Sequence, residues 1–356
     1  MMLPDPLVFY SQPGIMTDPG KHASVLAGLP DDLASICLAV QNNLVHVFWA
    51  ERMGLTLTED QQRSLQIRPV AEKLALIAET SDQPLSVPRP LDQRQVGNCR
   101  DFSVLLCSIL RYKGIPARAR CGFSVYFEPG QYVDHWVCEY WNAGTRRWAM
   151  VDSQLDSFER GALDIKFDPL DVPPEEFITA GRAWKMCRSG KADPDKFGIF
   201  DMHGIRFIWG DVVRDFLALN RIEILPWDGG WGFLNQKLSD PLPDEETLML
   251  YDKIAAMTLA INEKFPEIRA YYQSEPSFHI PPDGAYRKNS ARQVEGSNVG
   301  IDLSDPTKPN SALLYEKKSI LSLFSHVSLE GSRIGGAVCR FILTQIIRVG
   351  ISHPHM

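Results

Sequence analysis

The sequence predicts an α+β fold in which one helix packs on an antiparallel sheet, with helical segments added on both sides. Residues 97–116 combine an asparagine cap, apolar residues at helical spacing, and a glycine and a proline at the end. Residues 117–154 then hold three segments rich in aromatic and β-branched residues, separated by short glycine-containing turns. Consecutive strands with short turns are most simply antiparallel neighbours, and the preceding helix covers one face.

The composition is that of a globular protein. The chain has 356 residues, 44% of them apolar, which is enough for one large domain or two ordinary ones. Its formal net charge is −7, whereas binders of nucleic acid or anionic lipid concentrate Lys and Arg on one face. We therefore expect no nucleic-acid and no membrane partner. A small molecule, a peptide or a protein is the expected partner, and the oligomeric state is left open.

The seven cysteines form no CxxC pair and are scattered through apolar segments. This is not the pattern of a disulfide framework or a zinc site, and we expect neither a metal nor a cofactor. The N-terminus has no basic run before an apolar stretch, and no segment reaches the roughly 18 apolar residues of a membrane span. The expected location is a reducing cytoplasm. The cysteines are Cys37, Cys99, Cys107, Cys121, Cys138, Cys187 and Cys339.

Residues 1–85 are predicted to form a helical lead-in. After a stretch rich in Pro and Gly, apolar residues recur at helical spacing from residue 31 to residue 54. A second helix is predicted over residues 68–79. Three prolines between residues 84 and 90 then favour an extended approach to the next segment.

Residues 86–165 are predicted to form the core of the fold. Asn98 is a favourable N-cap, so the helix is expected from Cys99 to Lys113, where Gly114 ends it. The strands are expected within residues 117–127, 134–142 and 147–154.

Residues 166–270 are predicted to be a helical extension packed on the core. Residues 163–180 have the composition of a linker with short turns, residues 197–226 indicate one or two amphipathic helices, and residues 245–265 indicate another. Residues 271–356, rich in Pro and Ser, are predicted to be a partly disordered linker and tail.

Cys99 is the candidate nucleophile. A cysteine attacks as the thiolate, and a free pKa of about 8.5 leaves little of it ionised at neutral pH. The start of a helix offers unpaired backbone N–H groups and a favourable dipole, both of which lower the pKa of a thiol. Gly97 and Asn98 before it predict an exposed position. A lone helical cysteine is usually a core residue, and we assign the other six cysteines to the core.

His135 and Asp152 are the candidate base and its orienting carboxylate. The turn between their strands is centred near Gly144, so antiparallel counting places Asp152 within a few residues of the position opposite His135. A carboxylate within hydrogen-bond reach of an imidazole fixes its tautomer and supports its positive charge. Asp134 should point to the opposite face of its strand.

An oxyanion also needs hydrogen-bond donors. The backbone N–H of Cys99 is one expected donor. Gln93 and Gln95, in the extended segment before the helix, are the candidates for a second, and the choice between them stays open.

Residues 97–156 resemble the transglutaminase-like core shared by transglutaminases, peptide N-glycanases and many bacterial proteins. The resemblance rests on the segment around Cys99 with the following GIPAR, on DHWVCEYW around His135, and on WAMVD ending at Asp152. It implies a papain-like α+β architecture with a Cys nucleophile, a His base and an orienting Asp. The all-β flanks, acidic calcium loop and zinc-binding cysteine pairs of other members are missing, so the chain resembles a stand-alone bacterial-type member.

The leading hypothesis is a cysteine-dependent acyl-transfer enzyme. Cys99 would attack an amide or thioester carbonyl of a small molecule, peptide or protein, and the acyl-enzyme would pass to water, which makes hydrolysis of an amide or peptide the default. Transamidation or amide synthesis with an amine acceptor is one alternative. A non-catalytic binding module that kept the fold is the other.

Overall fold

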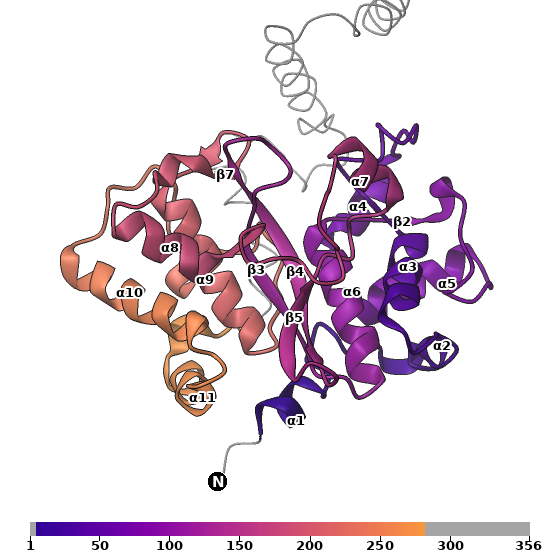
Figure 1. The fold of residues 1–356 in the computed structure, drawn as a ribbon, viewed down its shortest axis with the longest axis horizontal. Coiled ribbons are helices and arrows are strands. Elements are labelled where there is room, and N and C mark those ends of the chain that lie inside the picture. The colour runs from indigo at the N-terminus through magenta and orange to yellow at the C-terminus, as the bar shows by residue number, and fades with distance from the viewer. Residues whose placement is uncertain (1–4, 282–356) are drawn as a thin grey trace, which may run out of the picture. The chain divides into compact units, whose positions relative to one another are not determined.

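The computed structural model describes residues 5–281, in which a central sheet lies between two groups of helices (Figure 1). One group contains α3, α5 and α6, and the other contains α8 to α11. The predicted α+β class is confirmed. None of the helices in this part of the chain combines the length and apolar composition that a membrane span requires.

Residues 5–80 form helices and one short strand. The bounds are α1 Pro6–Tyr10, η1 Gly20–His22, α2 Ser24–Ala27, α3 Leu33–Asn43, β1 Leu44–His46, α4 Glu59–Arg63, η2 Ser64–Gln66 and α5 Val70–Thr80.

The predicted helix over residues 31–54 is wrong in its second half, because α3 ends at Asn43. The next three residues form β1, which pairs in parallel with β2 (Gln95–Gly97). The apolar residues after Asn43 therefore enter a two-stranded sheet, and that pairing comes from a segment fifty residues away that helical periodicity cannot reveal. The second predicted helix is confirmed as α5.

The helix predicted from Cys99 is confirmed as α6 (Cys99–Tyr112). Asn98 and Asp101 cap it reciprocally: Asn98 Oδ1 accepts a hydrogen bond from the Asp101 N–H, and Asp101 Oδ2 accepts one from the Asn98 N–H, both at 3.2 Å. Gly114 follows the helix with a φ of 74°, the left-handed conformation that glycine adopts without steric cost.

The sheet contains the three predicted strands and three shorter ones. Its strand order is β6-β3-β4-β7-β8, with β5 also paired to β4. The predicted hairpins are antiparallel, but β4 pairs in parallel with β7, so the sheet is mixed rather than wholly antiparallel. The bounds are β3 Ala117–Ser124, β4 Tyr132–Asn142, β5 Arg147–Val151, β6 Phe177–Thr179, β7 Phe197–Ile199 and β8 Met202–His203.

The parallel pairing has a simple cause. β5 pairs only with residues 138–142 of β4, so the other end of the long strand β4 keeps an open edge. Tyr132 and Val133 lie on that edge and pair with Phe197 and Gly198 of β7. An unpaired strand edge carries N–H and C=O groups that need partners, and β7 supplies them.

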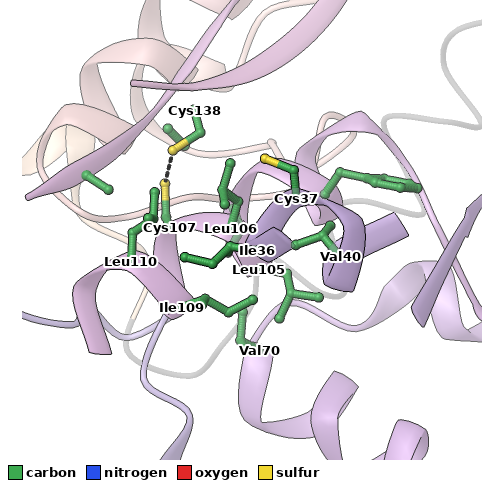
Figure 2. Packing of buried hydrophobic residues seen from close by; sticks show 14 of the residues in the cluster. Ile36, Cys37, Val40, Val70, Leu105, Leu106, Cys107, Ile109, Leu110 and Cys138 are labelled. Carbon is green, nitrogen blue, oxygen red and sulfur yellow. Dashed lines mark hydrogen bonds between the residues drawn. The ribbon is translucent and has the colours of Figure 1, made fainter. Parts of the chain in front are cut away.

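One hydrophobic core lies between α3, α5, α6 and the sheet (Figure 2). Cys37, Cys107 and Cys138 are buried in it as free thiols, and the Cys107 and Cys138 sulfurs are 3.3 Å apart. Cys121 is buried as well, whereas Cys187 is half-buried. Of the six cysteines other than Cys99 that the sequence assigns to the core, four are therefore buried as expected. The sixth, Cys339, lies outside the described residues.

A second core lies between the sheet and the later helices. The predicted helical region 197–226 begins with the β7–β8 hairpin and contains one helix, and the predicted helix over residues 245–265 ends at Leu259. The bounds are η3 Leu91–Gln93, α7 Ser157–Ala162, α8 Ala180–Arg188, η4 Pro194–Lys196, α9 Ile205–Leu219, η5 Gly232–Leu234, α10 Glu245–Leu259, α11 Phe265–Ser274 and η6 Pro276–Phe278.

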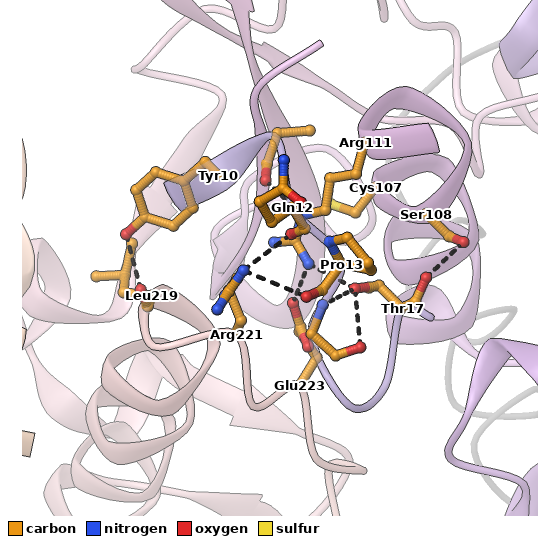
Figure 3. Close-up of polar contacts among 12 residues, drawn as sticks. Tyr10, Gln12, Pro13, Thr17, Cys107, Ser108, Arg111, Leu219, Arg221 and Glu223 are labelled. Atoms are coloured by element: carbon orange, nitrogen blue, oxygen red, sulfur yellow. Dashed lines mark hydrogen bonds and ion pairs between the residues drawn. The ribbon is translucent and has the colours of Figure 1, made fainter. Parts of the chain in front are cut away.

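The segments before and after the core are both bonded to it (Figure 3). Arg111 of α6 donates from Nη1 to Glu223 Oε1 at 3.1 Å and to Thr17 Oγ1 at 2.7 Å. The Tyr10 hydroxyl donates to the Leu219 carbonyl oxygen at 2.7 Å. Lead-in, core and extension thus form one compact unit.

The predicted segment boundaries do not coincide with the structure. The boundary at residue 85 separates β1 from its partner β2, and the boundary at residue 165 separates β6, β7 and β8 from the rest of their sheet. The boundary at residue 270 lies inside α11. Strands of two or three residues carry too little periodicity to be seen in the sequence. The remainder of the predicted tail, residues 282–356, lies outside the described residues.

Candidate active site

Cys99 is the first residue of α6, and its sulfur lies against β4. The backbone N–H groups of Trp136 and Arg100 both donate hydrogen bonds to it. The residue is only 9% exposed, so the predicted exposed position is wrong. The start of α6 is buried rather than exposed to solvent, because α6 packs on β4.

The pKa of the Cys99 thiol is raised well above its usual value, contrary to the direction predicted from the helix start. Burial is the main cause, and the nearby carboxylates of Asp134 and Asp152 add to it. The hydrogen bonds from Trp136 and Arg100 lower the pKa but do not outweigh burial. In this arrangement a thiolate therefore needs a proton acceptor close by.

His135 and Asp152 lie together as the hairpin geometry predicts. His135 Nε2 and Asp152 Oδ2 are 2.8 Å apart, and both side chains are 1% exposed. Cys138 pairs with Val151, so Asp152 follows β5 next to Val137, two residues from His135. Because Asp152 holds Nε2, the other ring nitrogen, Nδ1, remains for a proton from elsewhere.

The carboxylate of Asp152 is held by two further donors. The Tyr126 hydroxyl donates to Oδ2 at 2.6 Å, and the Gln154 N–H donates to Oδ1 at 3.0 Å. Burial alone would raise the pKa of Asp152, but His135, Tyr126 and Gln154 together keep that pKa below its usual value. Asp152 is therefore an ionised hydrogen-bond acceptor next to the His135 ring.

Aromatic rings from the β3–β4 loop cover the imidazole. The Phe127 ring centroid is 4.9 Å from that of His135 and the Tyr126 centroid is 6.0 Å away, both nearly perpendicular to it. Burial and the Asp152 carboxylate raise the pKa of Tyr126, so its hydroxyl stays a donor. The sequence pattern does not reveal Tyr126, because it predicts a strand over all of residues 117–127, whereas β3 ends at Ser124.

The two glutamines proposed as oxyanion donors are not brought to Cys99. Gln95 Nε2 donates to Thr80 Oγ1 at 3.1 Å, which turns the amide towards α5. Gln93 lies in η3, and within residues 5–281 its side chain makes no hydrogen bond to Cys99. The cause for Gln95 is local: β2 pairs with β1, and the Gln95 side chain is directed to the neighbouring helix.

One group of side chains in the described part of the chain has the spacing of metal ligands. Ligand atoms of Cys121, Asp134 and Asp211 all lie within 4.8 Å of one another. Arg214 already supplies a positive charge there, with its Nη1 3.3 Å from Asp211 Oδ1. Burial raises the pKa of Asp134 to about 6 and raises that of Asp211, so protons and Arg214 together can balance the two carboxyl groups.

Replacing Asp134 with Asn should increase the rate at which iodoacetamide alkylates Cys99. After burial, the Asp134 charge is the largest cause of the raised pKa of Cys99, and Asn removes that charge. Asp134 itself titrates with a pKa of about 6, so wild type and variant should differ above pH 6 and converge below it. Peptide mass analysis of Cys99 over a pH series measures this. A variant that alkylates no faster at pH 8 would show that the charge does not control the thiol.

The comparison with protein families supports the assignment made from the residues. Residues 58–153 match the family model of the transglutaminase-like superfamily, and the matched segment contains Cys99, His135 and Asp152. A solved structure of a candidate cysteine protease from Cytophaga hutchinsonii aligns at 18% identity and a TM-score of 0.30, over 50% of this chain and 46% of that one. The alignment thus spans about half of that protein's length. No curated protein matches the sequence. Residues 58–153, which contain the candidate site, are thus similar to the transglutaminase-like superfamily.

Proposed function

We propose that the protein is a cysteine-dependent acyl-transfer enzyme in which Cys99, His135 and Asp152 act together on an amide carbonyl. The observation that carries the proposal is the 2.8 Å distance between His135 Nε2 and Asp152 Oδ2. Trp136, the residue after His135 on β4, donates its backbone N–H to the Cys99 sulfur. A carboxylate-oriented imidazole on the strand that contacts a thiol at a helix start supports the assignment of Cys99 as the nucleophile.

The chemistry follows from which atoms are already held. Asp152 occupies Nε2, so Nδ1 of His135 accepts the proton of the Cys99 thiol. The thiolate then adds to the carbonyl carbon, and the tetrahedral intermediate expels the amine, which takes the proton from His135. Water next gives a proton to His135 and attacks the thioester, releasing the acid and restoring the thiol. The net reaction is hydrolysis of one amide bond.

Water is the acceptor we propose, because it requires no second binding site. An amine in its place would make the reaction transamidation or amide synthesis, with the same acyl-enzyme. The substrate class we propose is a small-molecule, peptide or protein amide, and the negative charge of the chain argues against nucleic acid or anionic membranes as partners. A reducing cytoplasm fits free thiols such as Cys107 and Cys138.

One observation favours a second candidate function, a binding module without turnover. Cys99 is 9% exposed and its pKa is raised, which are properties of an inert structural thiol. Against it, the ionised Asp152 carboxylate is buried between His135 and the Tyr126 hydroxyl, and burying that charge costs desolvation.

Reaction with p-nitrophenyl acetate tests the proposal. We expect a fast burst of nitrophenolate as Cys99 is acetylated, followed by slower turnover. Cys99→Ala should lack the burst. The matched control is Cys187→Ala, because Cys187 is the least buried of the other thiols in the described residues and should not contribute. A burst that survives in Cys99→Ala, or a wild-type protein with no burst, contradicts the proposal.

A further inference from the structure

A second histidine lies beside the start of α6. His46 is the last residue of β1, and the register places it opposite Gly97, two residues before Cys99. The Val47 N–H donates to the Gly97 carbonyl oxygen at 2.9 Å and holds the two segments together. The His46 ring centroid is 6.3 Å from that of Phe102, one helical turn after Cys99. His46 therefore faces the first turn of the helix that carries the thiol.

The protonation of this ring follows from its contacts. His46 Nδ1 accepts a hydrogen bond from the Phe48 N–H at 3.2 Å, so the neutral ring carries its proton on Nε2. Burial, with a smaller contribution from the charge of His135, lowers the pKa of His46 to about 3, although the Asp152 carboxylate acts in the opposite direction. The ring is thus neutral at physiological pH, and within residues 5–281 its Nε2–H makes no hydrogen bond.

We propose that the His46 Nε2–H donates a hydrogen bond to the oxyanion that forms on the substrate when Cys99 attacks, together with the backbone N–H of Cys99. This inference rests on the proposed function and gives His46 the role for which Gln93 and Gln95 were candidates. His46 is 6% exposed, and a desolvated donor held in place before reaction stabilises developing negative charge more than one in water does. Its low pKa keeps it a hydrogen-bond donor that transfers no proton, as a neutral imidazole can.

Two reactions of the full-length chain separate this role from a structural one. Acylation by p-nitrophenyl acetate passes through a tetrahedral oxyanion, whereas alkylation by iodoacetamide displaces iodide at a saturated carbon and forms none. The variants are His46→Phe, which keeps an aromatic ring of similar size without the donor, and His46→Gln, which keeps an N–H donor. Both rates are measured at Cys99, and a thermal melt of each variant checks folding.

We expect His46→Phe to acylate about 10²–10³-fold more slowly while its alkylation rate stays unchanged. His46→Gln should recover part of the acylation rate. If His46→Phe lost the same rate in both reactions, the proposal would be overturned, because His46 would then support the thiol rather than the oxyanion. Unchanged acylation in His46→Phe would overturn it as well. So would a His46→Gln variant that alkylates normally but recovers none of the acylation rate. A wild-type protein that is not acylated would overturn the proposed function and this role with it.

Discussion

Replacing Asp152 with Asn should slow the acylation of Cys99 by p-nitrophenyl acetate by about 10⁴-fold. Asp152 Oδ1 accepts from the Gln154 N–H, so the Asn carbonyl oxygen would take that position. Its NH₂ group would then face His135 Nε2 in place of Oδ2. Nε2 would have to become an acceptor, and the ring proton would move to Nδ1. The nitrogen that must take the Cys99 proton would then already carry one.

Tyr126→Phe is the matched control for this variant. It removes the 2.6 Å hydrogen bond to Asp152 Oδ2 but leaves the carboxylate and the His135 tautomer in place, so the loss of rate should be far smaller. Stopped-flow release of nitrophenolate measures both variants. An Asp152→Asn rate within about tenfold of the wild type would mean that the carboxylate does not set the tautomer of His135.

Asp215→Ala should lower the free energy of unfolding by about 3–5 kcal/mol. Asp215 is fully buried on α9 and binds both Nε and Nη2 of Arg120 at 2.9 Å. It also accepts a hydrogen bond from the backbone N–H of Cys121 at 3.1 Å. Cys121 belongs to β3, which α9 covers. The variant leaves a buried guanidinium with fewer partners and a buried N–H with none. Denaturant melts of the variant and the wild type measure the difference.

Asp171→Ala is the control, because Asp171 pairs with Arg147 through two hydrogen bonds as well, but both side chains are about half exposed. Asp171→Ala should lower the free energy of unfolding by at most about 1 kcal/mol. If the two variants lost equal stability, burial of the Asp215 network would not be the cause.

The ion pairs around Arg120 also make the stability of the fold depend on pH. Arg118 and Arg120 overcome the effect of burial and lower the pKa of Glu139 to about 2, from an ordinary 4.5. A lowered acid pKa stabilises the fold above the ordinary pKa, and this contribution is lost as the pH falls from 4.5 towards 2.

The sequence predicts the central part of the fold well because its signals are local. Asn98 and Gly114 mark the ends of α6 within a few residues of chain, and the tight turn near Gly144 sets the register that joins His135 to Asp152. Capping and hairpin geometry depend on neighbouring residues alone, which is why both elements could be placed.

The other features depend on partners distant in the chain. β1 forms because residues 95–97 pair with it, and β7 forms on an edge that β5 leaves open. Helical periodicity therefore predicts a helix at His46, whereas pairing places it opposite Gly97, the position on which its proposed role rests. The burial of Cys99 likewise comes from β4 packing on α6, which no local pattern encodes.

The site that p-nitrophenyl acetate acetylates tests the central claim most directly. The protein is quenched with acid during the burst, digested, and the acetyl group located by peptide mass. The account predicts an acetyl group on the peptide that contains Cys99, absent from His135→Ala under the same conditions. Acetylation confined to Cys187 or to lysines, or equal labelling of Cys99 in wild type and His135→Ala, would contradict it.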